Sequence, residues 1–97
     1  PGMILSNEPG YYEAGEYGIR IENLVLVKEI EETKWGKFLG FENITMCPID
    51  IRAIEPGMLN AEEKKWLNDY HKDVFRNLSP QLGKEEKEWL KKMTASI

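Results

Sequence analysis

The chain has 97 residues, of which 41% are hydrophobic and 31% charged, so it suits one compact domain or one half of a larger one, and wholesale disorder is excluded. The formal net charge is −4: residues 1–60 carry five Lys or Arg against ten Asp or Glu, and residues 61–97 carry eight against seven. Neither half has the basic stripe that nucleic-acid binding requires, and no apolar run approaches the roughly eighteen residues of a membrane span, so we expect neither kind of partner.

Two chemically reactive residue types occur once each, as Cys47 and His71. A single thiol cannot form an intramolecular disulfide or a thiolate zinc site, and it fits a reducing compartment. His71 falls in a predicted helix with no evident relationship to Cys47, so we expect a buried, inert thiol rather than a nucleophile. We also expect a cytoplasmic protein, because nothing at the start of the chain reads as a secretory signal.

The first half of the chain predicts strands. Residues 3–8 read as a short strand that stops at Pro9-Gly10, because proline lacks a ladder donor and glycine favours a turn. The turn dipeptide Pro1-Gly2 leads directly into this strand, so we expect structure before it. Residues 18–27 give the strongest strand signal, since branched residues dominate them, and Asn23 indicates a local irregularity.

A charged connection is expected over residues 28–37, followed by a third strand over residues 38–47 that Pro48 ends. Alternation in the central strand divides its side chains between two faces. One face is apolar and suits a core: Ile19, Ile21, Val25 and Val27. The other mixes charged and apolar side chains, as in a polar site cut into a buried sheet: Arg20, Glu22, Leu24 and Leu26.

The second half of the chain predicts two helices. Asn60 can cap the first, and Glu63 completes a capping-box pattern. Apolar residues then recur at helical spacing until Ser79-Pro80 ends the helix: Trp66, Leu67, Tyr70 or His71, Val74, Phe75 and Leu78. After Gly83, a shorter helix has a weaker pattern: Glu86, Trp89, Leu90 and Met93. We expect the aromatic residues to lie in a core or an interface, with Trp66, Tyr70, Phe75 and Trp89 exposed on stripes that fit a partner surface.

The glutamates near the strands are candidate metal ligands. Glu8 precedes Pro9, which restricts its backbone to an extended conformation. Glu22 lies in the central predicted strand, on the same face as Arg20 and about 7 Å from it. Rigidly held carboxylates suit hard cations such as manganese, magnesium or calcium. From spacing alone, two glutamates fourteen residues apart are weak evidence for a metal site. A structural Glu–Arg pair is the alternative for Glu22, and surface acidity alone is the commoner explanation of the acidic first half.

Several segments together resemble aminopeptidase P, the Xaa-Pro aminopeptidase of the M24 metallopeptidase family. The segments NEPGYY (residues 7–12) and GIRIEN (residues 18–23) resemble the last two metal-ligand motifs of that family. GFENITMCPID (residues 40–50) is similar to the segment that follows them in the long, three-domain form. WLNDYH (residues 66–71) and EWL (residues 88–90) resemble the C-terminal region of that form. The resemblance thus spans nearly the whole chain.

This resemblance implies an α+β fold, namely the C-terminal portion of a pita-bread domain with antiparallel strands followed by two C-terminal helices. Residues 1–50 would be the last strands of the catalytic domain, and residues 51–97 a helical C-terminal extension. The family binds two divalent cations, commonly manganese. By resemblance, Glu8 is a ligand of one metal and the general base for the attacking water, Glu22 bridges both metals, and Arg20 orients a ligand carboxylate.

The family's other ligands, two aspartates and a histidine, lie upstream of these motifs, and neither His71 nor Glu42 matches a ligand position. We therefore expect this fragment to be inactive alone and to need the upstream half of the catalytic domain. The parent enzyme would cleave the N-terminal Xaa-Pro bond of peptides with proline second. The alternative is a non-catalytic dimerisation or interaction module, since the family's C-terminal region helps to form a homodimer; a free-standing domain of unrelated function is the third reading.

Overall fold

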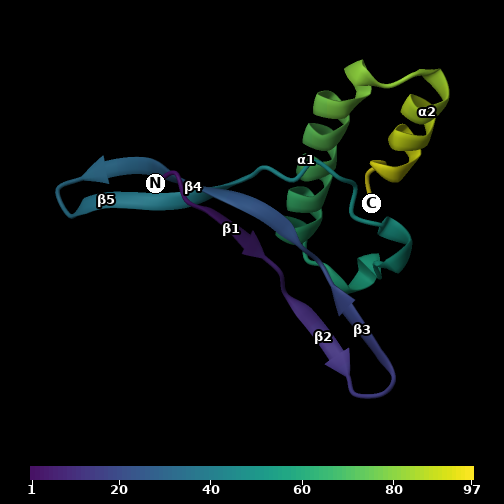
Figure 1. Ribbon diagram of the computed structural model, residues 1–97, viewed down its shortest axis with the longest axis horizontal. Helices are drawn as coiled ribbons and strands as arrows, with labels where there is room; N and C mark the ends of the chain where they lie inside the picture. Colours follow the sequence, from purple (N-terminus) through teal and green to yellow (C-terminus); the bar gives the residue numbers. More distant parts are fainter. The chain divides into compact units, whose positions relative to one another are not determined.

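The structure, a computed structural model, describes all residues 1–97 and contains two compact units, Pro1–Thr45 and Met46–Ile97. The first unit contains strands and the second contains helices (Figure 1). This confirms the expected order of antiparallel strands followed by two helices.

The strand unit contains two antiparallel sheets. Its strands are β1 (Ile4–Asn7), β2 (Gly10–Glu13), β3 (Tyr17–Arg20), β4 (Asn23–Thr33) and β5 (Gly36–Asn43). One sheet has the order β1-β4-β5, and the other is the hairpin β2-β3. Gly15 has a φ of +76° in the turn that joins β2 to β3, a conformation that costs glycine nothing.

The same pairing register between the two chain segments continues from the first sheet into the second. Asn7 lies opposite Asn23 in the first sheet, and Gly10 lies opposite Arg20 in the second. Between them, the Ile21 N–H donates to the Pro9 carbonyl at 3.1 Å. Pro9 has no N–H to donate to the Ile21 carbonyl, so only one of the two hydrogen bonds of this residue pair can form. The expected continuous strand over residues 18–27 is therefore wrong at residues 21–22, where the ladder is interrupted.

The charged connection expected over residues 28–37 is also wrong. β4 continues to Thr33 and β5 begins at Gly36, which leaves only residues 34–35 in the turn. Charged side chains fit this exposed ribbon because some of them pair across it: Lys28 Nζ lies 2.7 Å from Glu42, and Lys37 Nζ lies 3.5 Å from Glu29.

The last strand ends at Asn43 rather than at residue 47. Beyond it, the Thr45 hydroxyl accepts a hydrogen bond from the Leu24 N–H at 2.8 Å, and the Ile44 N–H donates to the Leu24 carbonyl at 3.0 Å. A side-chain oxygen thus takes the place of a ladder carbonyl, which ends the regular pairing.

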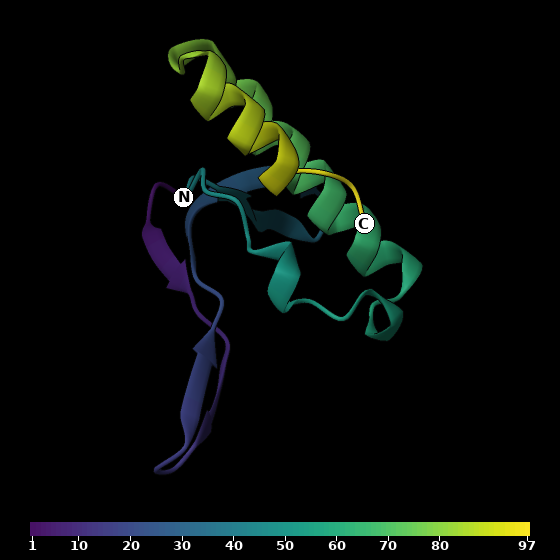
Figure 2. The same ribbon diagram turned by 90° about the vertical axis from the view of Figure 1, so that its right-hand side faces the viewer.

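The helical unit contains α1 (Ala61–Leu78) and α2 (Lys84–Met93), with short 3₁₀ turns at Ile51–Ala53, Pro56–Met58 and Ser79–Gln81. α2 returns alongside α1 (Figure 2). The predicted capping box is confirmed: Asn60 Oδ1 accepts from the Glu63 N–H, and Glu63 Oε2 accepts from the Asn60 N–H, both at 2.9 Å. Two backbone donors at the start of α1 are thereby satisfied.

The core of the helical unit is small. Tyr70, Val74 and Leu90 form its buried cluster, with Met46 and Ile49 among the partly buried residues packed against it. The segment that carries these last two residues is held to α1 by polar contacts as well. The Tyr70 hydroxyl donates to the Cys47 carbonyl at 3.1 Å, and His71 Nε2 accepts from the Ile49 N–H at 3.0 Å.

Two expectations about exposure are wrong in this unit. Tyr70 is buried, because its ring stacks on Trp66 with centroids 5.5 Å apart and its hydroxyl is bonded. Cys47 is exposed, because its carbonyl rather than its thiol faces Tyr70. Trp66 and Trp89 are exposed, as expected. No helix of the protein combines the length and apolarity needed to cross a bilayer.

Candidate metal-binding face

The two candidate glutamates lie opposite each other across the interrupted ladder. Because Asn7 pairs with Asn23 and Gly10 with Arg20, the continuing register places Glu8 opposite Glu22. Opposed residues of an antiparallel pair point to the same face. The structure thus brings together two residues that lie fourteen positions apart in the sequence.

The backbone hydrogen bonds define which kind of pair the glutamates form. The ladder bonds are made by odd-numbered residues, as between Ile21 and Pro9 or Val27 and Met3. Glu8 and Glu22 therefore form a non-hydrogen-bonded pair, the kind whose Cα atoms are about 4.5 Å apart and whose side chains are closest. Glu22 thus lies in the break between β3 and β4, not in the middle of a strand.

Arg20 lies on the same face as both carboxylates. Its Nη1 is 3.9 Å from Glu22 Oε2, and both side chains are about half exposed. The pKa of Arg20 is raised above its usual value, first by its hydrogen bond to Tyr12 and its electrostatic interaction with that residue, and further by the negative charges of Glu8 and Glu22. Arg20 therefore interacts electrostatically with both candidate ligands.

Tyr12 holds Arg20 in place and was missed in the sequence. Arg20 Nε donates to the Tyr12 hydroxyl at 2.9 Å, and the guanidinium carbon lies 5.9 Å from the centre of the Tyr12 ring. The ring uses space that two glycines leave open. A Cβ at Gly18 would lie 2.8 Å from Tyr12 Cδ1, and one at Gly10 would lie 2.6 Å from the Tyr12 hydroxyl oxygen.

A signal for Tyr12 was present in the sequence. Residues that share a face of this ladder have the same parity, so Glu8, Gly10 and Tyr12 on one chain segment face Arg20 and Glu22 on the other. Gly10 and Gly18 have no side chains on this face, so the large ring of Tyr12 can lie flat beside them. Reading this signal requires the register, which the sequence alone does not show.

The donor set fits a hard divalent cation. Two like-charged carboxylates directly opposite each other repel, and a cation between them would remove this repulsion. The chain contains no group of three or more His, Cys, Asp or Glu side chains placed to hold a metal ion. Glu8 and Glu22 are therefore a pair of carboxylates and not a complete ligand set. Glu42 pairs with Lys28 at 2.7 Å.

The comparisons with known proteins place the chain in a class of metallopeptidase. A family model described as metallopeptidase family M24 matches residues 1–29, and one described as the C-terminal region of peptidase_M24 matches residues 37–97. The chain belongs to the M24 metallopeptidase family.

Within this family, the chain is similar to proteins named for one activity. It is 52% identical over 101 residues to a probable Xaa-Pro aminopeptidase P of Coprinopsis cinerea, an alignment that covers 99% of this chain and 16% of the relative. The corresponding relative from Ajellomyces capsulatus strain NAm1 is 45% identical over 102 residues, covering 100% of this chain and 16% of its own.

A solved structure is similar over the same extent. The X-prolyl aminopeptidase of Caenorhabditis elegans, described as a cytosolic enzyme with a di-nuclear active site, matches with a TM-score of 0.82 and 33% identity. The match covers 97% of this chain and 16% of that one. The chain thus spans about one sixth of the length of the relatives it matches, and the resemblance noted in the sequence is confirmed.

Proposed function

We propose that this chain is the C-terminal part of a dinuclear metal-dependent aminopeptidase that hydrolyses the Xaa-Pro bond at the N-terminus of peptides with proline second. The observation that carries the proposal is the opposed pair Glu8 and Glu22 on one face of a shared register. In this proposal, residues 1–50 are the last strands of the catalytic domain and residues 51–97 its helical extension. The compact strand unit itself ends at Thr45.

Each residue of the face has a proposed role. Glu8 would be a metal ligand and the general base toward the attacking water, and Glu22 would be a ligand shared by two divalent cations. Arg20 orients the Glu22 carboxylate through their 3.9 Å contact, and Tyr12 holds Arg20 at 2.9 Å. Bound divalent ions, with manganese as the proposed metal, would supply a polarised carbonyl and an activated water.

The chain alone is proposed to be inactive. Two carboxylates without a third ligand leave a metal mostly coordinated by water, so we expect affinity no higher than that of a generic carboxylate pair. The upstream half of the catalytic domain is the proposed partner that completes the set. A cytoplasmic location is proposed by analogy with the Caenorhabditis elegans enzyme, which is described as cytosolic.

The test is the substitution Glu22→Gln in the protein expressed from its full reading frame. This change keeps the size of the side chain and removes its charge, so we expect metal content to fall and hydrolysis of an Xaa-Pro peptide to be lost. Metal content is measured by plasma mass spectrometry and turnover by release of the N-terminal residue. Glu42→Gln is the matched control, because Glu42 is also exposed in the strand unit but pairs with Lys28. Turnover retained by Glu22→Gln would refute the assignment.

A second candidate function is association with another copy of the protein. Trp66 is 50% exposed and Trp89 is 57% exposed, both on helices of the second unit. Large exposed aromatic side chains are typical of partner surfaces. Sedimentation equilibrium is expected to show a dimer that Trp89→Ala weakens. A monomer at all concentrations would refute this second function without affecting the first.

A further inference from the structure

The backbone on either side of Glu22 decides where its carboxylate lies. Glu22 is in the break between β3 and β4, so it belongs to no regular strand. Its side chain is about half exposed, and its ion pair with Arg20 is long, at 3.9 Å. Contacts of the carboxylate itself therefore hold it only loosely, and its position depends on how firmly its neighbours in the chain are fixed.

The neighbours on the two sides of Glu22 are held to different degrees. Before it, Ile21 makes a single hydrogen bond to Pro9, because proline has no N–H to donate in return. After it, Asn23 and Val25 are the only two buried residues of the strand unit. The firm support of Glu22 thus begins one residue after it.

Two side chains at the end of β5 and just beyond it provide this support. Asn23 Nδ2 donates to Asn43 Oδ1 at 3.3 Å, and the Ile44 N–H donates to the Leu24 carbonyl at 3.0 Å. In a regular antiparallel pair the Leu24 N–H would donate back to the Ile44 carbonyl. Here it donates to the Thr45 hydroxyl at 2.8 Å instead. A specific side chain therefore fixes the residue two positions after Glu22.

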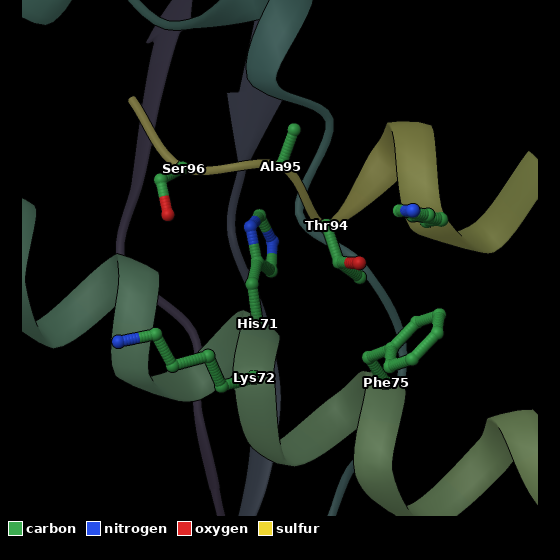
Figure 3. Close-up of a pocket in the computed structure, with 7 residues that line it drawn as sticks. His71, Lys72, Phe75, Thr94, Ala95 and Ser96 are labelled. Carbon is green, nitrogen blue, oxygen red and sulfur yellow. The ribbon is translucent and has the colours of Figure 1, made fainter.

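All the residues of this support belong to the strand unit, which ends at Thr45. The pocket of the helical unit is lined by residues of α1, α2 and the segment after α2, among them His71 and Phe75 (Figure 3). The pocket and the support of Glu22 have no residue in common, so a change in one can be made without altering the lining of the other.

We infer that Thr45 is a positioning residue for Glu22, assisted by Asn43. The inference rests on the proposed function, in which Glu22 is a ligand shared by two cations. Such cations lie about 3.5–4 Å apart, so a carboxylate between them has to be placed accurately. A displacement of about 1 Å can reduce the rate on the order of a hundredfold. Thr45 acts on Glu22 through the backbone of Leu24.

Thr45→Val tests this role, because it keeps the size of the side chain and removes the hydroxyl. In the full-length protein we expect the affinity for Mn²⁺ to fall by about tenfold, the lower end of the effect of changing groups that support metal ligands. Thr45→Ser keeps the hydroxyl and should restore the affinity. Calorimetric titration of the metal-free protein with Mn²⁺ measures it.

Thr33→Val is the matched control. The Thr33 hydroxyl also accepts a backbone N–H, from Trp35 at 3.1 Å, but it lies at the far end of β4. Thr33→Val should therefore leave the affinity for Mn²⁺ unchanged. Hydrogen exchange of the metal-free protein shows which N–H each change releases: exchange should be faster in residues 22–27 of Thr45→Val and near Trp35 in Thr33→Val.

A second variant covers the case in which Thr45→Val does not fold. Asn43→Ala removes the acceptor of the Asn23 side chain and should also weaken Mn²⁺ binding. Unchanged affinity in the folded variant of this pair, no recovery in Thr45→Ser, or an equal loss in Thr33→Val would each overturn the inference.

Glu22→Gln separates this failure from a failure of the proposed function. If Glu22→Gln loses Mn²⁺ binding while Thr45→Val keeps it, the positioning role alone is wrong. If Glu22→Gln binds Mn²⁺ as the unchanged protein does, the proposed function is wrong, and the positioning role with it.

Discussion

Adding one methyl group at Gly18 is expected to displace Arg20 without unfolding the protein. In Gly18→Ala, the new Cβ would lie 2.8 Å from Tyr12 Cδ1, whereas ordinary contact begins at 3.4 Å. The ring must therefore retreat by about 0.6 Å, and because its hydroxyl accepts the 2.9 Å hydrogen bond from Arg20 Nε, we expect this bond to be weakened or lost. Tyr12 is 59% exposed, so its ring can swing into solvent and the strands can stay paired.

The expected loss of activity is about 10- to 100-fold in kcat/KM, the usual effect of removing a residue that orients a metal ligand. Tyr12→Phe removes the same hydrogen bond and should give the same loss. Since both changes break one contact, the double variant should be no worse than either single variant. The assay is cleavage of an Xaa-Pro peptide by the full-length protein, with the Arg20 Nε–H resonance as a readout independent of turnover. Additive losses, or full activity of Gly18→Ala, would refute the positioning role.

Three further predictions concern the helical unit. Leu90→Ala should destabilise this unit by about 2–5 kcal/mol, because Leu90 is buried. Trp89→Ala should cost about 0.5 kcal/mol or less, because Trp89 is exposed. Hydrogen exchange of residues 84–93 measures the stability of both variants. Burial lowers the pKa of His71 below its ordinary 6.5, so the native state binds fewer protons than the unfolded state at acidic pH. The stability of the protein should therefore fall as the pH drops below about 6.5. In His71→Gln, the melting temperature should depend less on pH over this range. Arg52→Ala should raise the pKa of Asp50 from about 2 toward its ordinary 3.8, because the hydrogen bond from Arg52 is the main cause of its low value, and carboxyl NMR shifts between pH 1 and 6 report the change.

The helices were predictable from the sequence because their signals are local. The Asn60–Glu63 capping box and the spacing of Leu67, Tyr70 and Val74 depend only on neighbours within a few turns. The β4–β5 hairpin was not predictable in the same way. Its charged residues are stable in a strand because partners such as Glu42 lie across the ladder, far along the chain.

The residues of the candidate site also differ in whether a local sequence signal identifies them. Glu8, Glu22 and Arg20 were proposed from their motifs, and in the structure they lie on one face. Tyr12 was missed because its role depends on which residues face it across the hairpin. The exposure of Cys47 was predicted wrongly because it follows from the backbone direction at residues 46–49, which no side-chain pattern specifies.

The three-residue turn between β2 and β3 sets the pairing of Glu8 with Glu22, although neither residue lies in the turn. Deleting or inserting one residue at Ala14, Gly15 or Glu16 would shift the pairing by a single step, and Glu22 would then point away from Glu8. The loop joining β4 to β5 lies beyond both glutamates and carries no such constraint. A change of length in the β4–β5 loop would leave the pairing of Glu8 with Glu22 intact, whereas one in the β2–β3 turn must keep the two carboxylates in phase.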